Sequence, residues 1–300
     1  TKILPKTAII GATGILGSAF LPVHREIYPG CIGTRRDPIN RDFYHLDLSS
    51  VNITPLKLAS SGYRDALIFA GISKIATCQE NKELSRKINY EGTLSLIKQL
   101  VEEGIKPIFF SSDYVFDGLI GNYDDEAQPN PLNEYGRYKA GVEARMKEIC
   151  KEKYLVIRLS KIFSFEKGSG TIFDEMATIL TSGGIVRAAY DQIFSLTFLS
   201  DVVHVVTTLQ IHDATGVYNV CSPEIWSRYE LALKMADCLG VARERIEKIS
   251  LDELGESFTR PKNTTMATKK LNRHVPYRFT PIVECIKKIA ENWMAPKLTS

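Results

Sequence analysis

The chain has 300 residues, of which 44% are apolar and 24% are charged, and its formal net charge is +3. This composition is that of an ordinary globular protein, and so small a net charge gives no argument for nucleic-acid binding, which needs a clustered basic surface. No apolar run approaches the roughly 20 residues that a membrane-spanning helix requires.

Short apolar runs alternate with amphipathic stretches through the first half of the chain, and this pattern predicts strands that alternate with helices. The longest helical stretch ends at Gly104, a residue suited to a helix C-cap. We predict strands over residues 7–10, 30–33, 43–46, 66–70 and 108–111, helices over 18–27 and 81–103, a polar loop over 117–133 and a helix that begins near Tyr135.

The second half of the chain is less regular. We predict strands over 155–159 and 216–220, helices over 171–182 and 229–239, and a loop over 164–170. Continuously apolar strands separated by helices describe a parallel sheet covered on both faces. Because 300 residues exceed what one core usually serves, we expect an α/β protein with a Rossmann-type, doubly wound domain over 1–160 and a smaller C-terminal α/β domain over 161–300. Segments near 190–222 are expected to return to the first domain.

The turn after the first predicted strand reads Gly11-Ala12-Thr13-Gly14-Ile15-Leu16-Gly17. Glycines permit a tight strand-to-helix turn and a close approach of the backbone to a pyrophosphate, which the N–H groups at the start of the helix bind. Such a turn after a strand and before a helix is typical of a dinucleotide-binding site. A glycine-rich turn made only for packing is the alternative.

Two arginines, Arg35 and Arg36, follow the second predicted strand. A site specific for NAD often places a carboxylate there for the ribose 2′-hydroxyl, whereas guanidinium groups suit a 2′-phosphate. We therefore expect NADPH, with NADH as a further possibility; an arginine pair facing solvent is the alternative. Asp47 and Leu48 would flank the adenine, although an aspartate that closes a strand is also a common turn residue.

A hydroxyl, Ser112, follows the strand over 108–111, and Tyr135 and Lys139 lie four residues apart at the start of the next helix. Positions i and i+4 share a helix face, so we expect the Lys139 ammonium beside the Tyr135 phenol. A neighbouring cation lowers the pKa of an acid, which would make Tyr135 a usable proton donor near neutral pH. Because ligands of parallel sheets bind beyond the carboxyl ends of the strands, Ser112 and the glycine turn are expected at one crevice.

Six cysteines are scattered along the chain without the spacing of a metal site or a disulfide framework. We expect them to be buried free thiols in a reducing compartment, which together with the absence of a signal segment predicts a cytoplasmic protein without a metal. They are Cys31, Cys78, Cys150, Cys221, Cys238 and Cys285.

Further stretches match one known pattern together with these motifs. They are Ala70-Gly71-Ile72, Ser112-Asp113-Tyr114-Val115-Phe116-Asp117-Gly118, Pro131, Tyr135-Gly136, Lys139, Asp191-Gln192, Thr197, Gly216-Val217-Tyr218-Asn219, Ser227-Arg228-Tyr229-Glu230-Leu231-Ala232 and Arg260-Pro261-Lys262-Asn263-Thr264. On these residues and the glycine turn, the chain resembles an extended short-chain dehydrogenase/reductase, and within that group the dTDP-4-dehydrorhamnose reductase family. The resemblance covers essentially the whole chain and is most specific between Ser112 and Lys139.

The resemblance implies a Rossmann domain that binds NAD(P)H, the reduction of a 4-keto nucleotide-activated deoxysugar, and a possible homodimer. From the net charge and the lack of a long apolar run, we expect no nucleic-acid or membrane partner. It also implies that Tyr135 donates a proton to the developing alkoxide, that Lys139 holds the nicotinamide ribose, and that Ser112 hydrogen-bonds the carbonyl oxygen. The implied cofactor-binding residues are Gly11, Thr13, Gly14, Ile15, Leu16, Gly17, Arg35, Arg36, Asp47, Leu48, Ala70, Gly71, Tyr135 and Lys139. The implied substrate-binding residues are Asp113, Tyr114, Phe116, Lys161 and Gln192, although Phe116 could instead pack in the core.

Two departures weaken the transfer of the substrate from that family. Lys161 follows Arg158-Leu159-Ser160, at a place where the rhamnose enzymes have a tryptophan that lines the sugar site, and Leu196 replaces a proline. A cation in place of a flat aromatic ring changes both shape and charge, so the sugar or the nucleotide can differ. Lys161 could contact a phosphate or face solvent.

Two other functions remain open. One is an epimerase or dehydratase that keeps its NAD(H) bound; the pair of Arg35 and Arg36, and the absence of a glutamate beside the catalytic hydroxyl, argue against it. The other is an NADP-binding regulatory module like the β subunit of methionine adenosyltransferase, which shares the sequence from Ser111 to Gly118. The sequence names neither the sugar, nor the nucleotide, nor the stereochemistry of the product.

Overall fold

The computed structural model describes residues 3–37 and 42–295. Its centre is a sheet of five parallel strands in the order β1-β4-β5-β6-β11. These strands are β1 (Thr7–Ile10), β4 (Asp65–Ile68), β5 (Lys106–Ser112), β6 (Leu155–Leu159) and β11 (Gly216–Val220). Two short strands, β2 (Thr34–Arg35) and β3 (Tyr44–His45), pair with each other, and a bridge from Gly33 to Ile9 continues the sheet beyond β1. The resulting order is that of a Rossmann fold, which confirms the predicted fold class.

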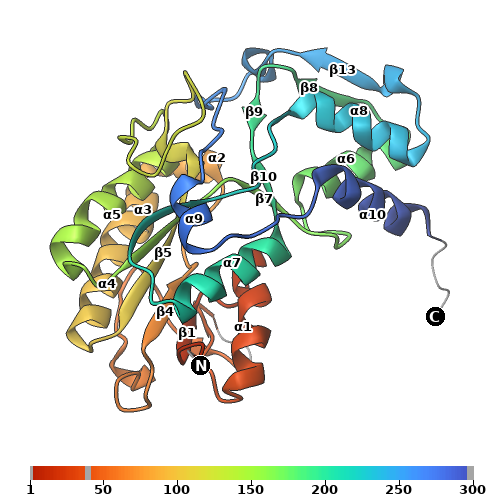
Figure 1. The fold of residues 1–300 in the computed structure, drawn as a ribbon. Helices are drawn as coiled ribbons and strands as arrows, with labels where there is room; N and C mark the ends of the chain where they lie inside the picture. The colour runs from red at the N-terminus through yellow and green to blue at the C-terminus, as the bar shows by residue number, and fades with distance from the viewer. Residues whose placement is uncertain (1–2, 38–41, 296–300) are drawn as a thin grey trace.

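Helices cover both faces of this sheet because successive strand residues point to opposite sides. Ile10 packs into a core with α4 (Thr93–Glu102) and α5 (Glu134–Cys150), whereas Ile9 packs into a core with α1 (Ile15–Ile27) and α7 (Leu199–Ile211). Figure 1 shows the two helical layers on either side of the strands. A short helix, α9 (Lys269–His274), brings Leu271 into the second of these cores.

A separate apolar core lies in the second lobe of the molecule, at the upper right of Figure 1. Its helices are α6 (Ile172–Thr181), α8 (Arg228–Leu239) and α10 (Ile282–Met294), and its parallel strand pair is β8 (Val186–Ala189) with β13 (Ile246–Ile249). Two short ladders join this lobe to the sheet. They pair β7 (Lys161–Phe163) with β10 (Leu196–Phe198) and β9 (Ile193–Phe194) with β12 (Trp226–Ser227). The predicted division of roles at residue 160 stays a prediction.

The long predicted helix is correct in extent but not uniform. After α2 (Ile75–Glu80), it consists of α3 (Lys82–Arg86), a π-helical turn (Lys87–Gly92) and α4. A side chain at Gly92 would place its Cβ 1.9 Å from the carbonyl oxygen of Leu48, so the helix crosses the backbone after β3 in close contact. Single π-helical turns inside α-helices often occur at functional sites.

The strand predicted over residues 30–33 is wrong. The N–H of Cys31 closes a turn onto the carbonyl of Tyr28, and the N–H of Ile32 donates to the hydroxyl of Tyr63. With these two donors occupied outside the sheet, the ladder begins only at Gly33, and Arg35 lies within β2 instead of after it. The helix predicted from residue 18 begins earlier, at Ile15.

The six cysteines are unpaired; five are buried, and Cys238 is half-buried. Within residues 3–37 and 42–295, no group of three or more His, Cys, Asp and Glu side chains is arranged to hold a metal ion. None of the helices in the same ranges is long and apolar enough to cross a bilayer.

His24 on α1 is fully buried, and neither of its ring nitrogens has a hydrogen-bond partner among the described residues. Burial lowers the pKa of His24 from 6.5 to about 4. The folded state therefore binds this proton more weakly than the unfolded chain, so His24 destabilises the fold as the pH falls below about 6.5.

We expect this effect to remove about 2 kcal/mol of the free energy of unfolding between about pH 7.5 and about pH 5. His24→Leu, which replaces the ring with an apolar side chain, should lose that part of the pH dependence while other titrating groups continue to contribute. Urea denaturation of both proteins at the two pH values checks the prediction. Identical pH dependence in the variant and the parent would contradict it.

Candidate active site

Two adjoining cavities follow the carboxyl edge of the sheet. The first, of about 350 Å³, lies beyond β1 and β2, and the second, of about 530 Å³, is lined by residues of both lobes. Phe69 lines both, and a narrow cleft beside Gly71 and Tyr135 lies between them. Ligands of doubly wound sheets bind at this edge. The two cavities therefore form the candidate site.

The sequence-predicted residues divide between the cavities. The first is lined by Gly11, Thr13, Gly14, Arg35, Arg36, Asp47, Leu48, Ala70 and Gly71. The second is lined by Ile15, Leu16, Ser112, Asp113, Tyr114, Tyr135, Lys139, Lys161 and Gln192. Gly17 and Phe116 line neither of these two cavities.

The glycine turn lets its backbone lie very close to neighbouring backbone segments. Gly11 has a φ of +87°, and a Cβ there would lie 2.6 Å from the nitrogen of Ala70. A Cβ at Gly17 would lie 2.2 Å from the carbonyl oxygen of Gly11, so Gly17 acts by packing the helix against the turn. Gly14 precedes α1 without a side-chain cap, and the first turn of α1 holds no acidic residue. Its uncapped N–H groups beside the first cavity fit the pyrophosphate of a dinucleotide.

Arginines and carboxylates share the wall of the first cavity. Arg36 forms an exposed ion pair with Asp37 at 2.9 Å. Asp47 accepts the N–H of Ser49 at 2.8 Å, and that hydrogen bond lowers the pKa of Asp47. Exposed ion pairs contribute little free energy, so Arg36 can exchange Asp37 for a phosphate. Arg35, on β2, completes the cationic part of this wall.

The turn after β5 is locked to the start of α5. The Asn133 side chain caps α5 by accepting the N–H of Gly136 at 3.0 Å. A Cβ at Gly136 would lie 2.1 Å from the carbonyl oxygen of Tyr114, so only glycine permits this contact. The lock brings Ser112 and Tyr135, which are far apart in sequence, to the same cavity.

The expected lowering of the Tyr135 pKa by Lys139 is wrong in this structure. Burial raises the pKa of Tyr135, the nearby Asp113 carboxyl raises it further, and only the Ser112 hydroxyl opposes the rise substantially. The Lys139 ammonium does lie beside Tyr135, 5.7 Å from its ring centroid, as predicted, but its hydrogen bond goes to the carbonyl oxygen of Phe110 at 2.7 Å. Burial also lowers the pKa of Lys139 to about 8, so the ammonium stays mostly charged at neutral pH and begins to lose its proton above it.

Asp113 puts a buried carboxyl beside the candidate catalytic hydroxyl. Ser112 donates to Asp113 Oδ1 at 3.0 Å. Burial raises the pKa of Asp113 to about 6, against the opposing effect of its hydrogen bonds with Thr264 and Ser112. The carboxyl can therefore change its charge close to neutral pH.

The structure does not support the prediction that Phe116 binds substrate. It is 1% exposed and stacks on the ring of Tyr123 with centroids 4.3 Å apart. The guanidinium carbon of Arg158 lies 5.0 Å from its ring centroid. Phe116 thus packs in a small core beneath the loop after β5 and does not face either cavity.

Two arginines beside the second cavity and one amide in the narrow cleft are not among the predicted site residues. Arg228 and Arg260 lie within stretches that carried the resemblance, but no spacing rule placed them near Ser112. Asn89 lies in the π-helical turn, and its side chain accepts the N–H of Ile72 at 2.7 Å and donates to the carbonyl of Ile72 at 2.8 Å. These two hydrogen bonds hold the backbone after Gly71 in the wall of the narrow cleft.

A buried ionic network supports α5 from behind the cavity. Glu143 follows Tyr135 and Lys139 at four-residue steps, so the three share one face of α5. It pairs with Arg158 of β6 at 2.7 Å, and the two side chains are 6% and 4% exposed. Arg158 also donates to the carbonyl of Asp125 at 3.2 Å.

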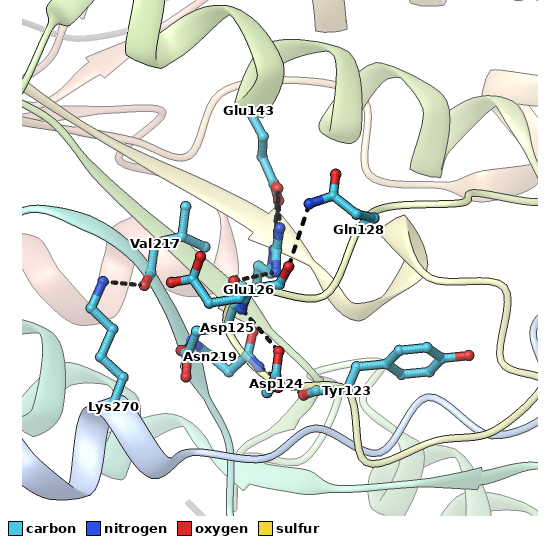
Figure 2. Close-up of polar contacts among 10 residues, drawn as sticks. Tyr123, Asp124, Asp125, Glu126, Gln128, Glu143, Val217, Asn219 and Lys270 are labelled. Atoms are coloured by element: carbon cyan, nitrogen blue, oxygen red, sulfur yellow. Dashed lines mark hydrogen bonds and ion pairs between the residues drawn. The ribbon is translucent and has the colours of Figure 1, made fainter.

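The same network fixes the polar loop to the sheet, as Figure 2 shows. The Asp125 carboxylate accepts the N–H of Asn219 on β11 at 2.7 Å, and the Asn219 amide donates to the carbonyl of Tyr123 at 2.9 Å. Lys270 donates to the carbonyl of Val217 at 2.8 Å. The loop that precedes the Tyr135 helix is therefore anchored to two strands of the sheet, β6 and β11.

Comparisons with known proteins agree with this geometry. The model of a family described as "RmlD substrate binding domain" matches residues 6–294. A probable low-salt glycan biosynthesis reductase of Haloferax volcanii is 25% identical over 269 residues, 86% of this chain and 88% of that protein. Methionine adenosyltransferase 2 subunit beta of Xenopus tropicalis is 25% identical over 280 residues, 89% of this chain and 82% of that protein.

The fold is also similar to that of solved structures. A dTDP-4-dehydrorhamnose reductase from Bacillus anthracis, in complex with NADP, has a TM-score of 0.78 and 22% identity to this chain. The similarity covers 96% of this chain and 99% of that one. At this identity, the comparison shows a shared fold.

Proposed function

We propose, from the premise that the chain belongs to the RmlD substrate-binding domain family, that it reduces the 4-keto group of a nucleotide-activated deoxysugar with NADPH. The observation that carries the proposal is that Ser112, Tyr135 and Lys139 line one cavity, which adjoins a second cavity with the glycine turn and two arginines. The first cavity suits a dinucleotide because the turn beside it is tight, with Gly11 and Gly17 at the two positions where a side chain would collide with the neighbouring backbone.

The cofactor supplies the hydride when it is bound, and the chain's own residues handle the oxygen. Ser112, whose hydroxyl donates to Asp113 Oδ1 in the structure, turns toward the substrate, donates a hydrogen bond to the keto oxygen and stabilises the negative charge that develops there. Tyr135 gives that oxygen its proton, which completes the conversion of the ketone to an alcohol. The phenol is protonated at neutral pH and so holds the proton that reduction requires, although its raised pKa makes Tyr135 a weaker acid than an ordinary tyrosine. Solvent then returns the proton to Tyr135.

The two arginines should give a preference for NADPH. In a variant with both Arg35→Gln and Arg36→Gln, we expect NADPH to bind at least about tenfold more weakly and NADH to bind almost as before, since charge-assisted bonds to the 2′-phosphate are lost. Fluorescence titration of each cofactor measures this. Arg273→Gln, an exposed arginine on α9, is the matched control. Equal weakening of both cofactors would count against a 2′-phosphate contact.

The proposed reaction is tested by NADPH consumption with a panel of 4-keto nucleotide sugars that differ in the nucleotide and in the sugar. Turnover of at least one member supports the proposal. Tight NADPH binding without turnover of any member would overturn it.

A second candidate function is a regulatory subunit that binds NADP. The observation that favours it is that methionine adenosyltransferase 2 subunit beta and a glycan biosynthesis reductase are equally identical to this chain, at 25%. The epimerase or dehydratase remains a third candidate on the same scaffold.

Assembly as a homodimer stays a prediction that size-exclusion chromatography with light scattering tests.

A further inference from the structure

Three cations gather in or beside the wall of the second cavity, on the side contributed by the second lobe. Lys161 begins β7 and is open to the cavity, and its ammonium makes no hydrogen bond or ion pair with the described residues. Arg228 begins α8 and donates to the side-chain oxygen of Gln192, another cavity residue, at 3.0 Å. Arg260 pairs with Glu256 and donates to the hydroxyl of Tyr114 at 3.2 Å.

Among the residues that the structure describes, one of these three cations has a carboxylate partner. Within the described residues, Arg260 forms an ion pair with Glu256, whereas Lys161 and Arg228 form none. Two positive charges in this wall are thus unpaired. Unpaired positive charges in a recessed site attract anions.

The groups that act on Lys161 come from four elements. Asp113 in the turn after β5 and Glu175 on α6 favour its charged form, whereas Arg228 and Arg260 oppose it. Burial by the surrounding protein outweighs all four, and the pKa of Lys161 falls to about 8. Asp113 is already engaged by Ser112, so it does not neutralise Lys161 directly.

We propose that Lys161 and Arg228, with Arg260 beside them, form the anchor for the diphosphate of a nucleotide ligand. A diphosphate diester carries two negative charges, which match the two unpaired cations. The inference rests on the proposed function for the nucleotide sugar that would bring the diphosphate to the cavity. Lys161 then acts as a specificity-determining residue of the second cavity.

One expected consequence of this anchor is that Lys161 takes up a proton when the anion binds. An anion in contact with an ammonium favours its charged form, so binding shifts Lys161 toward protonation. Above about pH 8, the free protein has lost much of this proton, and affinity for the anion should fall as the pH rises. Asp113 titrates about two pH units lower, but Lys139 has a pKa of about 8 as well. Variants of Lys161 must therefore separate the two lysines.

The test is calorimetric titration of the full chain with dTDP, UDP and inorganic pyrophosphate at about pH 8.5, in two buffers of different ionisation enthalpy. We expect uptake of a fraction of a proton. Lys161→Met should weaken binding about 30-fold, the loss of a bond to a charged group. Lys161→Arg should retain affinity within about threefold but lose the uptake, because arginine does not titrate in this range. Lys287→Met, an exposed lysine on α10, is the control and should match the parent.

Two results would overturn the inference: unchanged affinity in Lys161→Met, or unchanged proton uptake in Lys161→Arg, which would assign the uptake to Lys139. These outcomes are distinct from failure of the proposed function. Proton uptake that depends on Lys161, without turnover of any keto sugar, would support the anchor and contradict the proposed reductase function. Turnover with the same KM in Lys161→Met and the parent would support the reductase function and contradict the anchor.

Discussion

Tyr135→Phe should lower kcat by about three orders of magnitude and leave the affinity for NADPH almost unchanged. The substitution removes only the phenolic oxygen, so the ring keeps its edge contact with Tyr114, whose centroid is 6.2 Å away. What is lost is the proton that the developing alkoxide needs. Steady-state kinetics on any substrate that the panel identifies, together with NADPH titration, measures both quantities.

Tyr138→Phe is the matched control for this prediction. Tyr138 lies on the same helix, but its hydroxyl donates to the carbonyl of Lys82 at 3.0 Å and lines neither large cavity. Its kcat should stay within about twofold of the parent, as is usual for changes away from the chemistry. A kcat for Tyr135→Phe close to that of Tyr138→Phe would contradict the proposal that Tyr135 donates the proton.

Arg158→Met should destabilise the fold by about 3–5 kcal/mol, because it leaves the Glu143 carboxylate buried without its partner. The change also removes the guanidinium that covers Phe116 and the bond to the carbonyl of Asp125. Urea denaturation near neutral pH gives the free energy of unfolding. The double variant Arg158→Met with Glu143→Leu removes both charges and should recover much of the loss.

The surface pair of Arg243 and Asp237 is the control for the buried pair. Its side chains are 63% and 36% exposed, and Arg243→Met should change stability little, since solvent screens such pairs. If the double variant is as unstable as Arg158→Met alone, the cost lies in lost packing and not in the unpaired carboxylate. That outcome would refute the electrostatic explanation.

Sequence reasoning succeeded where local signals and topology agree. The bounds of β6, β11 and α8 follow within one residue from continuous apolar runs and from helix ends. It missed α10, whose buried Ile282, Ile286 and Ile289 repeat at helical spacing and could have been found. It also missed β13, whose two middle residues are exposed and charged, so that its apolar pattern is too short to detect.

For the site, the sequence located the groups at strand ends but not their electrostatic state. The raised pKa of Tyr135 and the bond from Lys139 to Phe110 depend on burial and on backbone carbonyls, which no motif encodes. The burial of Phe116 depends on Arg158, which comes from another strand. Arg228 stands beside Lys161 only because the second lobe folds over the sheet edge.

Transfer of a labelled hydride tests the central claim most directly. The measurement uses NADPH that carries deuterium at the transferable position of the nicotinamide, a 4-keto nucleotide sugar, and mass spectrometry of both products. A reductase should yield NADP⁺ without the label and an alcohol with one deuterium on the former keto carbon. A sugar that stays unlabelled while NADPH remains bound, or a label that returns to the cofactor after isomerisation of the sugar, would contradict the claim.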